Sequence, residues 1–174
     1  VFRGSRDGQL DTLEHFVTGA EKLPDSVIDL VNGLPNAVIL EGYGITECAP
    51  VITINRADEP QAGVGKPLPG IEIKIVDLDS HEELKTGERG LILVNGPNVF
   101  GQYMGVDKDP FLEIENERWY DTGDLGYLNE DGFLFLSGRL KRFVKIAGEM
   151  ISLPAIESAL TERWPADESG AVLA

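Results

Sequence analysis

Two short segments that lie far apart in the chain carry side chains suited to binding a nucleotide. The first is GYGITE, in which Tyr43, Thr46 and Glu47 follow the apolar run 37–40. Magnesium usually takes one or two carboxylates together with substrate phosphates, so Glu47 is a candidate metal ligand and Thr46 a candidate catalytic contact to phosphate. Tyr43 offers a flat face on which a purine could stack. The alternative is a strand-end turn with a surface threonine and glutamate.

The second segment is WYDTGD, which places Asp124 directly after Gly123. An acidic side chain after a glycine turn can accept both hydroxyl groups of a ribose, and its alternative role is to cap the turn. Asp121 is the weaker candidate and fits a structural role better. Arg139 follows further along; its guanidinium could span a ribose hydroxyl or a phosphate oxygen, or form a surface ion pair of little energetic worth.

The segments around the first site predict a helix followed by a strand. Asp25 or Ser26 fits the N-cap of the helix, and Gly33 fits its end. Its buried stripe would consist of Val27, Ile28, Leu30 and Val31. The run 37–40 has the length of a strand and leads into a turn at Gly42 and Gly44, where backbone amides become available to a ligand.

From residue 51 the pattern favours strands. Isoleucines alternate with charged residues over 71–75, and 90–94 is a second apolar strand. Segments 124–129 and 133–136 flank an Asp-Gly turn and predict a hairpin. A final helix should begin near Ser152 and end at Pro165. Its stripe would consist of Leu153, Ile156, Leu160 and Trp164.

Composition narrows the class of protein. The net charge of −15 argues against a nucleic-acid binder and against adhesion to anionic lipid. No apolar run of about 18 residues is present, so nothing here predicts a transmembrane span. The single cysteine, Cys48, cannot form an internal disulfide, which fits a reducing compartment, and we expect it to be a small buried hydrophobic residue rather than a nucleophile.

Basic residues are concentrated in one acid-free stretch, which contains Arg139, Lys141, Arg142 and Lys145. The stretch could bind phosphate or attract an acidic partner on an otherwise repulsive molecule, or it could be a solvated face.

Five motifs together, in order and spacing, resemble the adenylate-forming superfamily of acyl-CoA synthetases, firefly luciferase and peptide-synthetase adenylation domains. They are YGITE at 43–47, GVGKPLPG at 63–70, the GERG to FGQYMG region at 87–105, WYDTGD at 119–124 and GRLKRFVKIAGE at 138–149. The resemblance covers nearly the whole chain from about Phe16 onward. Agreement of five linked motifs by chance is far rarer than agreement of one.

The resemblance implies a mixed α/β fold in three parts. Residues 1–50 would be the end of an α/β layer, 51–138 a β-rich subdomain of the same large domain, and 139–174 the hinge and the incomplete start of a small C-terminal lid domain. It also implies that ATP or AMP and magnesium bind here.

The resemblance assigns a role to each candidate position. Gly19 and Ala20 would run past the adenine and Tyr43 would stack on it, beside Gly44. Thr46 would meet the phosphate, Glu47 would hold magnesium, and Asp124 and Arg139 would bind the ribose. Lys141 would be the hinge. The lid loop that approaches the acceptor thiol would contain Lys145, Gly148 and Glu149.

A narrower resemblance is to the acyl-[acyl-carrier-protein] synthetase half of bacterial 2-acylglycerophosphoethanolamine acyltransferases, carried by YGITECAPVITIN and KRFVKIAGEMISLPAIESAL. It implies a ligase that activates a fatty acid and passes it to the pantetheine thiol of an acyl carrier protein. The ligase would lie on the cytoplasmic side, and its parent could associate with the inner membrane. Two rival hypotheses stay open: an acyl-CoA synthetase that uses coenzyme A, and a non-enzymatic module that retains a nucleotide-binding fold.

Two motifs of the superfamily are absent from this sequence: the Ser/Thr/Gly-rich loop ending in Pro-Lys, and the late Pro-x-x-x-x-Gly-Lys. We therefore expect an excised segment of a longer enzyme. Without those elements the charge that develops on the α-phosphate is poorly stabilised, so the 174-residue polypeptide should not form adenylates by itself.

Overall fold

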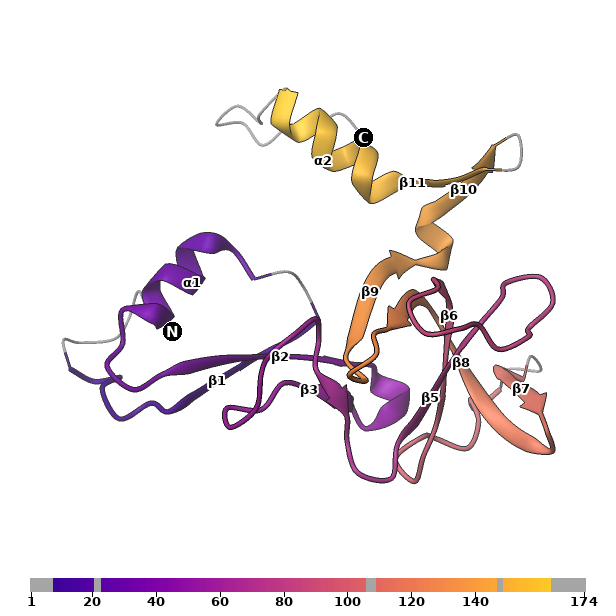
Figure 1. Ribbon diagram of the computed structural model, residues 1–174, viewed down its shortest axis with the longest axis horizontal. Helices are drawn as coiled ribbons and strands as arrows, with labels where there is room; N and C mark the ends of the chain where they lie inside the picture. Colours follow the sequence, from indigo (N-terminus) through magenta and orange to yellow (C-terminus); the bar gives the residue numbers. More distant parts are fainter. Residues whose placement is uncertain (1–7, 21–22, 106–108, 147–148, 164–174) are drawn as a thin grey trace.

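The computed structural model describes residues 8–20, 23–105, 109–146 and 149–163. The described chain is mixed α/β and mostly strand, with two sheets and a C-terminal hairpin and helix (Figure 1).

The first sheet begins with a parallel pair joined across a helix. Its order is β1-β2-β3-β4. Strand β1 (His15–Thr18) pairs in parallel with β2 (Val38–Gly44), from His15 beside Val38 to Thr18 beside Glu41. Parallel neighbours need a crossover connection, and α1 (Asp25–Asn32) lies in that connection. β3 (Val51–Ile54) and the short β4 (Lys66–Pro67) complete the sheet with antiparallel pairs.

Helix α1 differs from the sequence prediction at its start and along its stripe. Pro24 is the N-cap, and no side chain of Asp25 or Ser26 caps the helix. Gly33 ends it as predicted, donating its N–H to Asp29 O at 3.0 Å. Val31 is fully buried whereas Leu30 is 52% exposed. Successive residues are about 100° apart around a helix, so this short helix buries the side centred on Val31 and leaves Leu30 outside.

Strand β2 is longer than predicted and contains the two glycines that were expected to form a turn. Gly42 and Gly44 pair with Ile54 and Val51 of β3. A Cβ atom on Gly42 would lie 2.9 Å from Thr53 O, and one on Gly44 would lie 2.0 Å from Pro50 O. The glycines therefore allow the neighbouring backbone to approach closely, and the predicted turn at Gly42 and Gly44 is wrong.

The second sheet contains the alternating strand and the hairpin that the sequence predicts. Its strands are β5 (Glu72–Val76), β6 (Gly90–Asn95), β7 (Phe111–Ile114), β8 (Glu117–Leu128) and β9 (Leu134–Arg139). The order is β5-β6-β8-β7, with β9 also paired to β8. β8 and β9 form the predicted hairpin, in which Asn129 N donates to Phe133 O at 3.0 Å across the turn.

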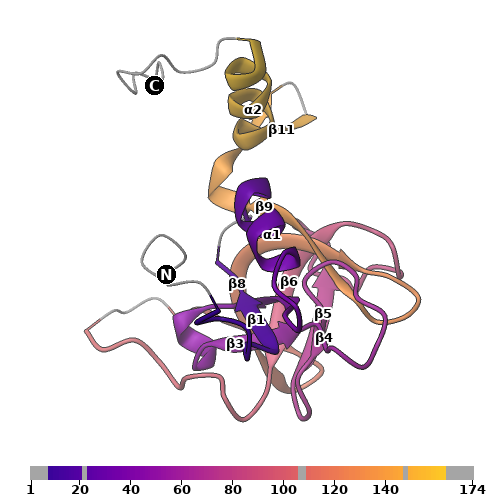
Figure 2. The ribbon, with the colours of Figure 1, turned by 90° about the vertical axis from the view of Figure 1, so that its left-hand side faces the viewer.

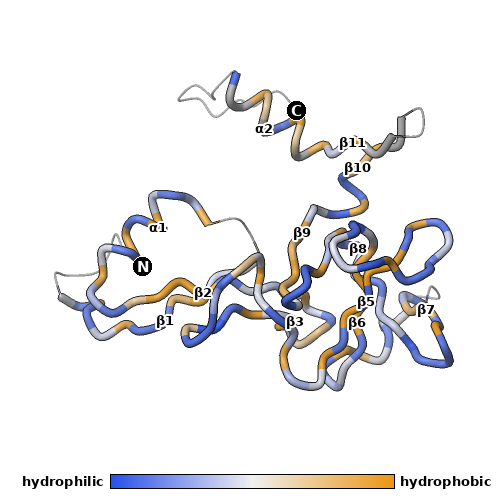
Figure 3. Tube along the Cα trace, viewed as in Figure 1, coloured by the Kyte–Doolittle hydropathy of each residue, from blue (hydrophilic) through white to orange (hydrophobic). Residues whose placement is uncertain are grey.

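The two sheets share one hydrophobic core. Ile52 of the first sheet packs with Ile92 and Leu134 of the second, and all three side chains are fully buried. Figure 3 colours stretches of β5 and β6 as hydrophobic. The predicted limit at residue 50 falls between paired strands β2 and β3, so the first sheet continues across it as far as Pro67. The three-part division remains a prediction.

The C-terminal elements are η3 (Leu140–Arg142), β10 (Phe143–Ile146), β11 (Glu149–Ser152) and α2 (Leu153–Arg163), and β10 pairs with β11 in antiparallel. Leu140 of η3 and Phe143 of β10 pack against the core of the second sheet, whereas β11 and α2 stand apart from both sheets (Figures 1 and 2). Ala155 N donates to Ser152 Oγ at 3.3 Å, which confirms the helix start.

The predicted stripe of α2 is not buried among the described residues. Leu153, Ile156 and Leu160 are 37%, 44% and 46% exposed, because neither sheet packs against this helix. Trp164 and Pro165, which were predicted to complete and end the helix, lie outside the described residues. No helix in the described ranges is both long and apolar enough to cross a membrane.

Candidate functional site

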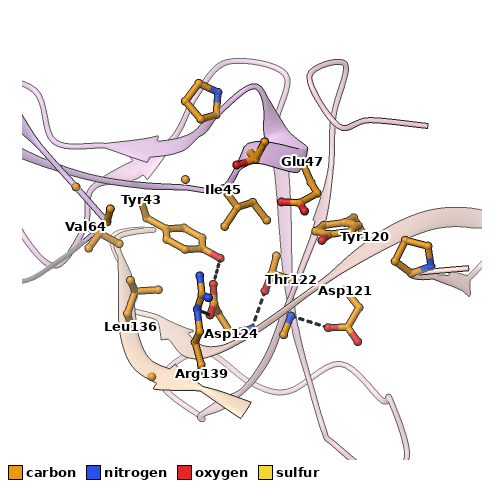
Figure 4. Close-up of a pocket in the computed structure, with 18 of the residues that line it drawn as sticks. Tyr43, Ile45, Glu47, Val64, Tyr120, Asp121, Thr122, Asp124, Leu136 and Arg139 are labelled. Atoms are coloured by element: carbon orange, nitrogen blue, oxygen red, sulfur yellow. Dashed lines mark hydrogen bonds and ion pairs between the residues drawn. The ribbon is translucent and has the colours of Figure 1, made fainter. Parts of the chain in front are cut away.

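One cleft of about 1230 Å³ opens between the two sheets, where β1 and β2 end near β8 and β9 (Figure 4). Small-molecule pockets are commonly about 300–1,000 Å³, so this space can hold a nucleotide and part of a second substrate. The predicted site residues that line it are Gly19, Ala20, Tyr43, Gly44, Thr46, Glu47, Asp124, Arg139 and Lys141. The carboxylates of Glu47 and Asp124 thus belong to the same cleft.

The described structure gives only the backbone position of two lid-loop residues. Lys145 lies in β10 and Glu149 in β11. Gly148 lies outside the described residues. Their predicted role near an acceptor thiol therefore stays a prediction.

Asp124 is held between a tyrosine and an arginine. Tyr43 Oη donates to Asp124 Oδ2 at 2.7 Å, and Arg139 Nε lies 3.2 Å from Asp124 Oδ1. Asp124 and Tyr43 are 6% and 7% exposed, whereas the Arg139 side chain is 71% exposed. The arginine therefore has most of its surface free for a ligand, while the tyrosine hydroxyl is committed to the carboxylate.

Burial dominates the ionisation of this pair. It raises the pKa of Asp124 above its ordinary value, and the Tyr43 hydrogen bond and the Arg139 charge oppose that rise. Burial, followed by the Asp124 charge, raises the pKa of Tyr43 strongly. The phenol therefore stays protonated and remains a hydrogen-bond donor to Asp124.

A bulge in β8 places Asp124 at the cleft. The pairing of β6 with β8 shifts at this point: Leu91 pairs with Leu125 but Leu93 with Asp121. Gly123 takes a left-handed φ of 68° there, and its N–H donates to Asp121 Oδ1 at 2.8 Å. Asp121 thus caps the Gly123 turn, the structural role that the sequence left open for Asp124. Asp124 itself lies within a strand rather than a loop.

Glu47 sits on η2 (Thr46–Cys48), a single turn between β2 and β3. Ile45 N donates to Pro50 O at 2.8 Å, which closes the chain around this turn. Thr46 is exposed and Glu47 is partly buried. Tyr103 Oη donates to Glu47 Oε1 at 2.6 Å and also lies 3.2 Å from Tyr120 Oη. Figure 4 shows Glu47 and Asp124 facing the cleft from opposite walls.

Tyr103 and Tyr120 are site residues that the sequence reasoning missed. Both line the cleft. The signal that could have identified them is their position inside the FGQYMG and WYDTGD motifs. Contacts across 56 and 17 residues leave no trace in local periodicity.

The donor set suits a magnesium ion that is held mainly by phosphate. Among the described residues, no group of three or more histidine, cysteine, aspartate or glutamate side chains is positioned to hold a metal. Magnesium commonly binds through one or two carboxylates plus substrate phosphates and water. The single carboxylate of Glu47 is sufficient for that pattern.

Gly19 and Ala20 lie at the end of β1, where that strand meets β2. A Cβ atom on Gly19 would lie 3.0 Å from Gly42 O, so a side chain here would be tight. Ala20 has a left-handed φ of 70°. Both residues are exposed at the cleft, so their backbone is accessible to a ligand.

The basic stretch is partly neutralised. Arg139 pairs with Asp124, and Arg142 pairs with Glu157 of α2 at 2.6 Å. Lys141 is exposed at the cleft edge, and no acidic partner is found for it in the described ranges. Cys48 is fully buried in the shared core, and burial, then the Glu47 charge, raises the pKa of its thiol to about 11. This agrees with a small buried residue.

Comparison with known proteins gives a consistent result. The family model described as AMP-binding enzyme matches residues 3–104. A long-chain-fatty-acid--CoA ligase of Salmonella typhimurium is 36% identical over 141 residues, which are 80% of this chain and 25% of the relative. A 4-coumarate--CoA ligase-like protein of Arabidopsis thaliana is 33% identical over 86% of this chain and 27% of the relative.

Solved structures agree with the sequence comparisons. The structure of the anthranilate CoA ligase AuaEII in complex with anthranoyl-AMP superposes with a TM-score of 0.70 and 28% identity, covering 90% of this chain and 30% of that one. The chain therefore spans roughly a quarter to a third of the length of these relatives. Because the family model matches more than half of its residues, and relatives at least 30% identical match most of it, the chain belongs to the AMP-binding enzyme family.

Proposed function

We propose that this chain forms part of an ATP-dependent ligase that converts a carboxylic acid into an acyl-adenylate and then into a thioester. The observation that carries the proposal is the single cleft shared by Glu47 and Asp124. In this proposal one carboxylate would meet a metal-bound phosphate and the other a ribose. Membership in the AMP-binding family supports the nucleotide, and an anthranoyl-AMP complex in a structural relative supports the adenylate.

In the first half-reaction a carboxylate oxygen of the acid attacks the α-phosphorus of ATP, the bond to the bridging oxygen breaks, and pyrophosphate leaves. Magnesium, when bound, supplies positive charge that offsets the charge on the phosphates. Glu47 would hold that ion and Thr46 would donate its hydroxyl to phosphate. Asp124 would accept the ribose hydroxyls, while Tyr43 fixes its carboxylate and Arg139 reaches ribose or phosphate with its free donors.

In the second half-reaction a thiol sulfur attacks the acyl carbonyl carbon, loses its proton, and displaces AMP. Lys141 would be the hinge about which the C-terminal lid turns to admit the thiol, and Lys145, Gly148 and Glu149 would lie near it. The position of Lys141 in η3, between β9 and the C-terminal hairpin, supports this role.

Coenzyme A is the acceptor that the relatives' names favour. An acyl carrier protein remains the second candidate, because its phosphopantetheine offers the same thiol. Positive charge on this chain would attract an acidic carrier, and Lys141 is exposed with no acidic partner in the described ranges. Coenzyme A is preferred because the relatives are named as coenzyme A ligases. A long-chain fatty acid is the first acid to test.

The test is acid-dependent release of pyrophosphate by the full-length protein. A bound metal contributes several kcal/mol of charge stabilisation and each 1.4 kcal/mol is tenfold, so Glu47→Ala should lower the rate roughly 100-fold. Glu130→Ala, in the exposed turn between β8 and β9, is the control and should leave the rate unchanged. Equal rates for the two variants would remove the metal assignment, and failure to release pyrophosphate with any acid would favour a non-enzymatic module.

A matched thiol comparison separates the acceptors. The full-length protein should form thioester faster with coenzyme A than with phosphopantetheinylated carrier protein at equal thiol concentration. The 174-residue polypeptide alone should release no pyrophosphate.

A further inference from the structure

One segment between β6 and β7 contacts the glutamate turn at both its backbone and its side chain. We call residues 98–103 the brace. Asn98 Nδ2 donates to Cys48 O at 2.6 Å and to Val51 O at 3.0 Å, which ties the two ends of the turn together. Phe100 N donates to Glu47 O at 2.8 Å. The brace thus fixes the backbone that carries Glu47 before the side chain is considered.

Tyr103 completes the brace by holding the carboxylate itself. Its hydroxyl donates to Glu47 Oε1 at 2.6 Å, a length expected of a short bond to an ionised acceptor. A phenol has one proton, so once it is donated to Glu47 the 3.2 Å contact with Tyr120 Oη must be donated by Tyr120. The result is a chain from Tyr120 to Tyr103 to Glu47, in which each bond polarises the next.

The aromatic setting fixes the ring of Tyr103 at the cleft. Phe100 meets it edge to face at 4.6 Å and also packs against Tyr120 at 5.4 Å. Tyr120 is 5% exposed and anchors the group in the core, whereas Tyr103 is 38% exposed and lines the cleft. A tyrosine needed only for packing would be expected to lie deeper, like Tyr120.

The Tyr103 hydrogen bond leaves the second carboxylate oxygen of Glu47 available. Among the described residues Glu47 has no ion pair, and no hydrogen bond is found for its Oε2 atom. A lysine or arginine at the same place would neutralise the carboxylate and compete with a cation. A phenol fixes one oxygen without adding positive charge, so the second oxygen remains a ligand.

We propose that Tyr103 is a positioning residue that holds Glu47 for a divalent cation, with Tyr120 orienting its hydroxyl. This inference rests on the proposed function, since it takes Glu47 as the metal ligand. Partners that orient a metal ligand typically change metal affinity about 10- to 100-fold when they are removed.

The experiment compares Tyr103→Phe with Tyr127→Phe in the full-length protein. Tyr127 stacks on Phe135 at 5.0 Å in the β8–β9 hairpin. No partner is found for its hydroxyl among the described residues. Tyr127→Phe therefore removes the same group as Tyr103→Phe, but outside the site. Binding of ATP is measured by calorimetry with manganese ions and, separately, with a chelator and no metal. Manganese takes the same oxygen ligands as magnesium.

Tyr103→Phe should raise the manganese concentration needed for half-maximal ATP binding roughly tenfold, and leave metal-free ATP binding unchanged. Tyr127→Phe should change neither. In a Glu47→Ala background, Tyr103→Phe should add nothing, because the contact it removes is already gone.

Four outcomes overturn the inference. The first is that Tyr103→Phe and Tyr127→Phe show equal metal dependence of ATP binding, although Glu47→Ala abolishes that dependence. In that case the inference fails and the proposed function stands. Equal losses with and without metal would show that Tyr103 only supports the fold of the cleft. An additive effect in the Glu47→Ala background would place its action elsewhere. If Glu47→Ala itself has no effect on metal dependence, the proposed metal site fails first and the inference fails with it.

Discussion

The hydrogen bond from Tyr43 to Asp124 predicts a stability change that depends on pH. Tyr43→Phe removes the hydroxyl group that donates a hydrogen bond to Asp124 at 2.7 Å, and Asp124 is only 6% exposed. The ring itself is retained, so no cavity larger than one oxygen atom forms. Arg139 remains as the other partner of Asp124, but its side chain is 71% exposed and solvent screens most of that interaction.

The magnitude follows from the charge and burial of the acceptor. A hydrogen bond to a charged group contributes about 1.5–3 kcal/mol, and leaving a buried acceptor short of a partner carries the full desolvation penalty. Tyr43→Phe should therefore lower the free energy of unfolding by about 1.5–3 kcal/mol near neutral pH. For a chain of this size that corresponds to a decrease in Tm of roughly 3–12 °C.

The sign of the pH dependence follows from the raised pKa of Asp124. Burial makes the folded state bind this proton more tightly than the unfolded state, so ionised Asp124 destabilises the fold above its folded pKa and has no such effect below its unfolded pKa. The Tyr43 hydrogen bond opposes burial by favouring the ionised form. Removing it raises the pKa of Asp124 further, so the loss of stability should be largest near neutral pH and should shrink as Asp124 becomes protonated.

The assay is thermal unfolding of Tyr43→Phe and Tyr127→Phe at about pH 7 and about pH 4, followed by tryptophan fluorescence, since Trp119 is 1% exposed in the core. Tyr127→Phe should change the free energy of unfolding by less than about 0.5 kcal/mol at either pH. The other carboxylates titrate in both variants, so comparing the variants at the same pH removes their contribution. Equal effects of the two substitutions near neutral pH, or a Tyr43→Phe effect that grows on acidification, would refute the reasoning.

Two further predictions concern the turn beside Glu47. Gly44→Ala should destabilise the chain by about 3 kcal/mol or more, because its Cβ would lie 2.0 Å from Pro50 O; Gly123→Ala meets no atom within 4 Å and should cost only the roughly 1–2 kcal/mol of a left-handed alanine. Urea unfolding of both variants measures the difference, and similar midpoints would contradict it. The Cys48 thiol, fully buried and with its pKa raised to about 11, should resist a thiol reagent at about pH 8 until urea unfolds the chain. Stoichiometric labelling of the folded chain within minutes would show that the thiol is accessible.

Local patterns predicted the parts of the fold that local interactions determine. The alternation over 71–75 and the Asp-Gly turn after β8 gave β5 and the β8–β9 hairpin, because side-chain period and turn chemistry are properties of a few adjacent residues. The length of β2 was missed because its second half is a strand only through pairing with β3. The outer face of α1 and the stripe of α2 were predicted to be buried, but the described residues form no core that covers them.

For the site, the sequence identified which residues meet in the cleft but not which residues hold them. Motif order was enough to select Glu47, Asp124 and Arg139. The bonds from Tyr43 to Asp124 and from Tyr103 to Glu47 join positions 81 and 56 residues apart, and no periodic pattern contains that information. The role of Asp121 as the cap of Gly123 also required the bulge in β8 to be seen.

The two carboxylates of the cleft have the same kind of support. Each accepts a hydrogen bond from a phenol, Tyr43 at Asp124 and Tyr103 at Glu47. A phenol steadies a carboxylate without cancelling its charge, which suits groups that must accept ribose hydroxyls or bind a cation. The two tyrosines differ in how deeply they are buried. Tyr43 is 7% exposed, so its loss should appear first in stability; Tyr103 is 38% exposed, so its loss should appear first in metal affinity. The same Tyr→Phe exchange should therefore have different primary effects at the two positions, and this difference distinguishes a support within the fold from one at the ligand.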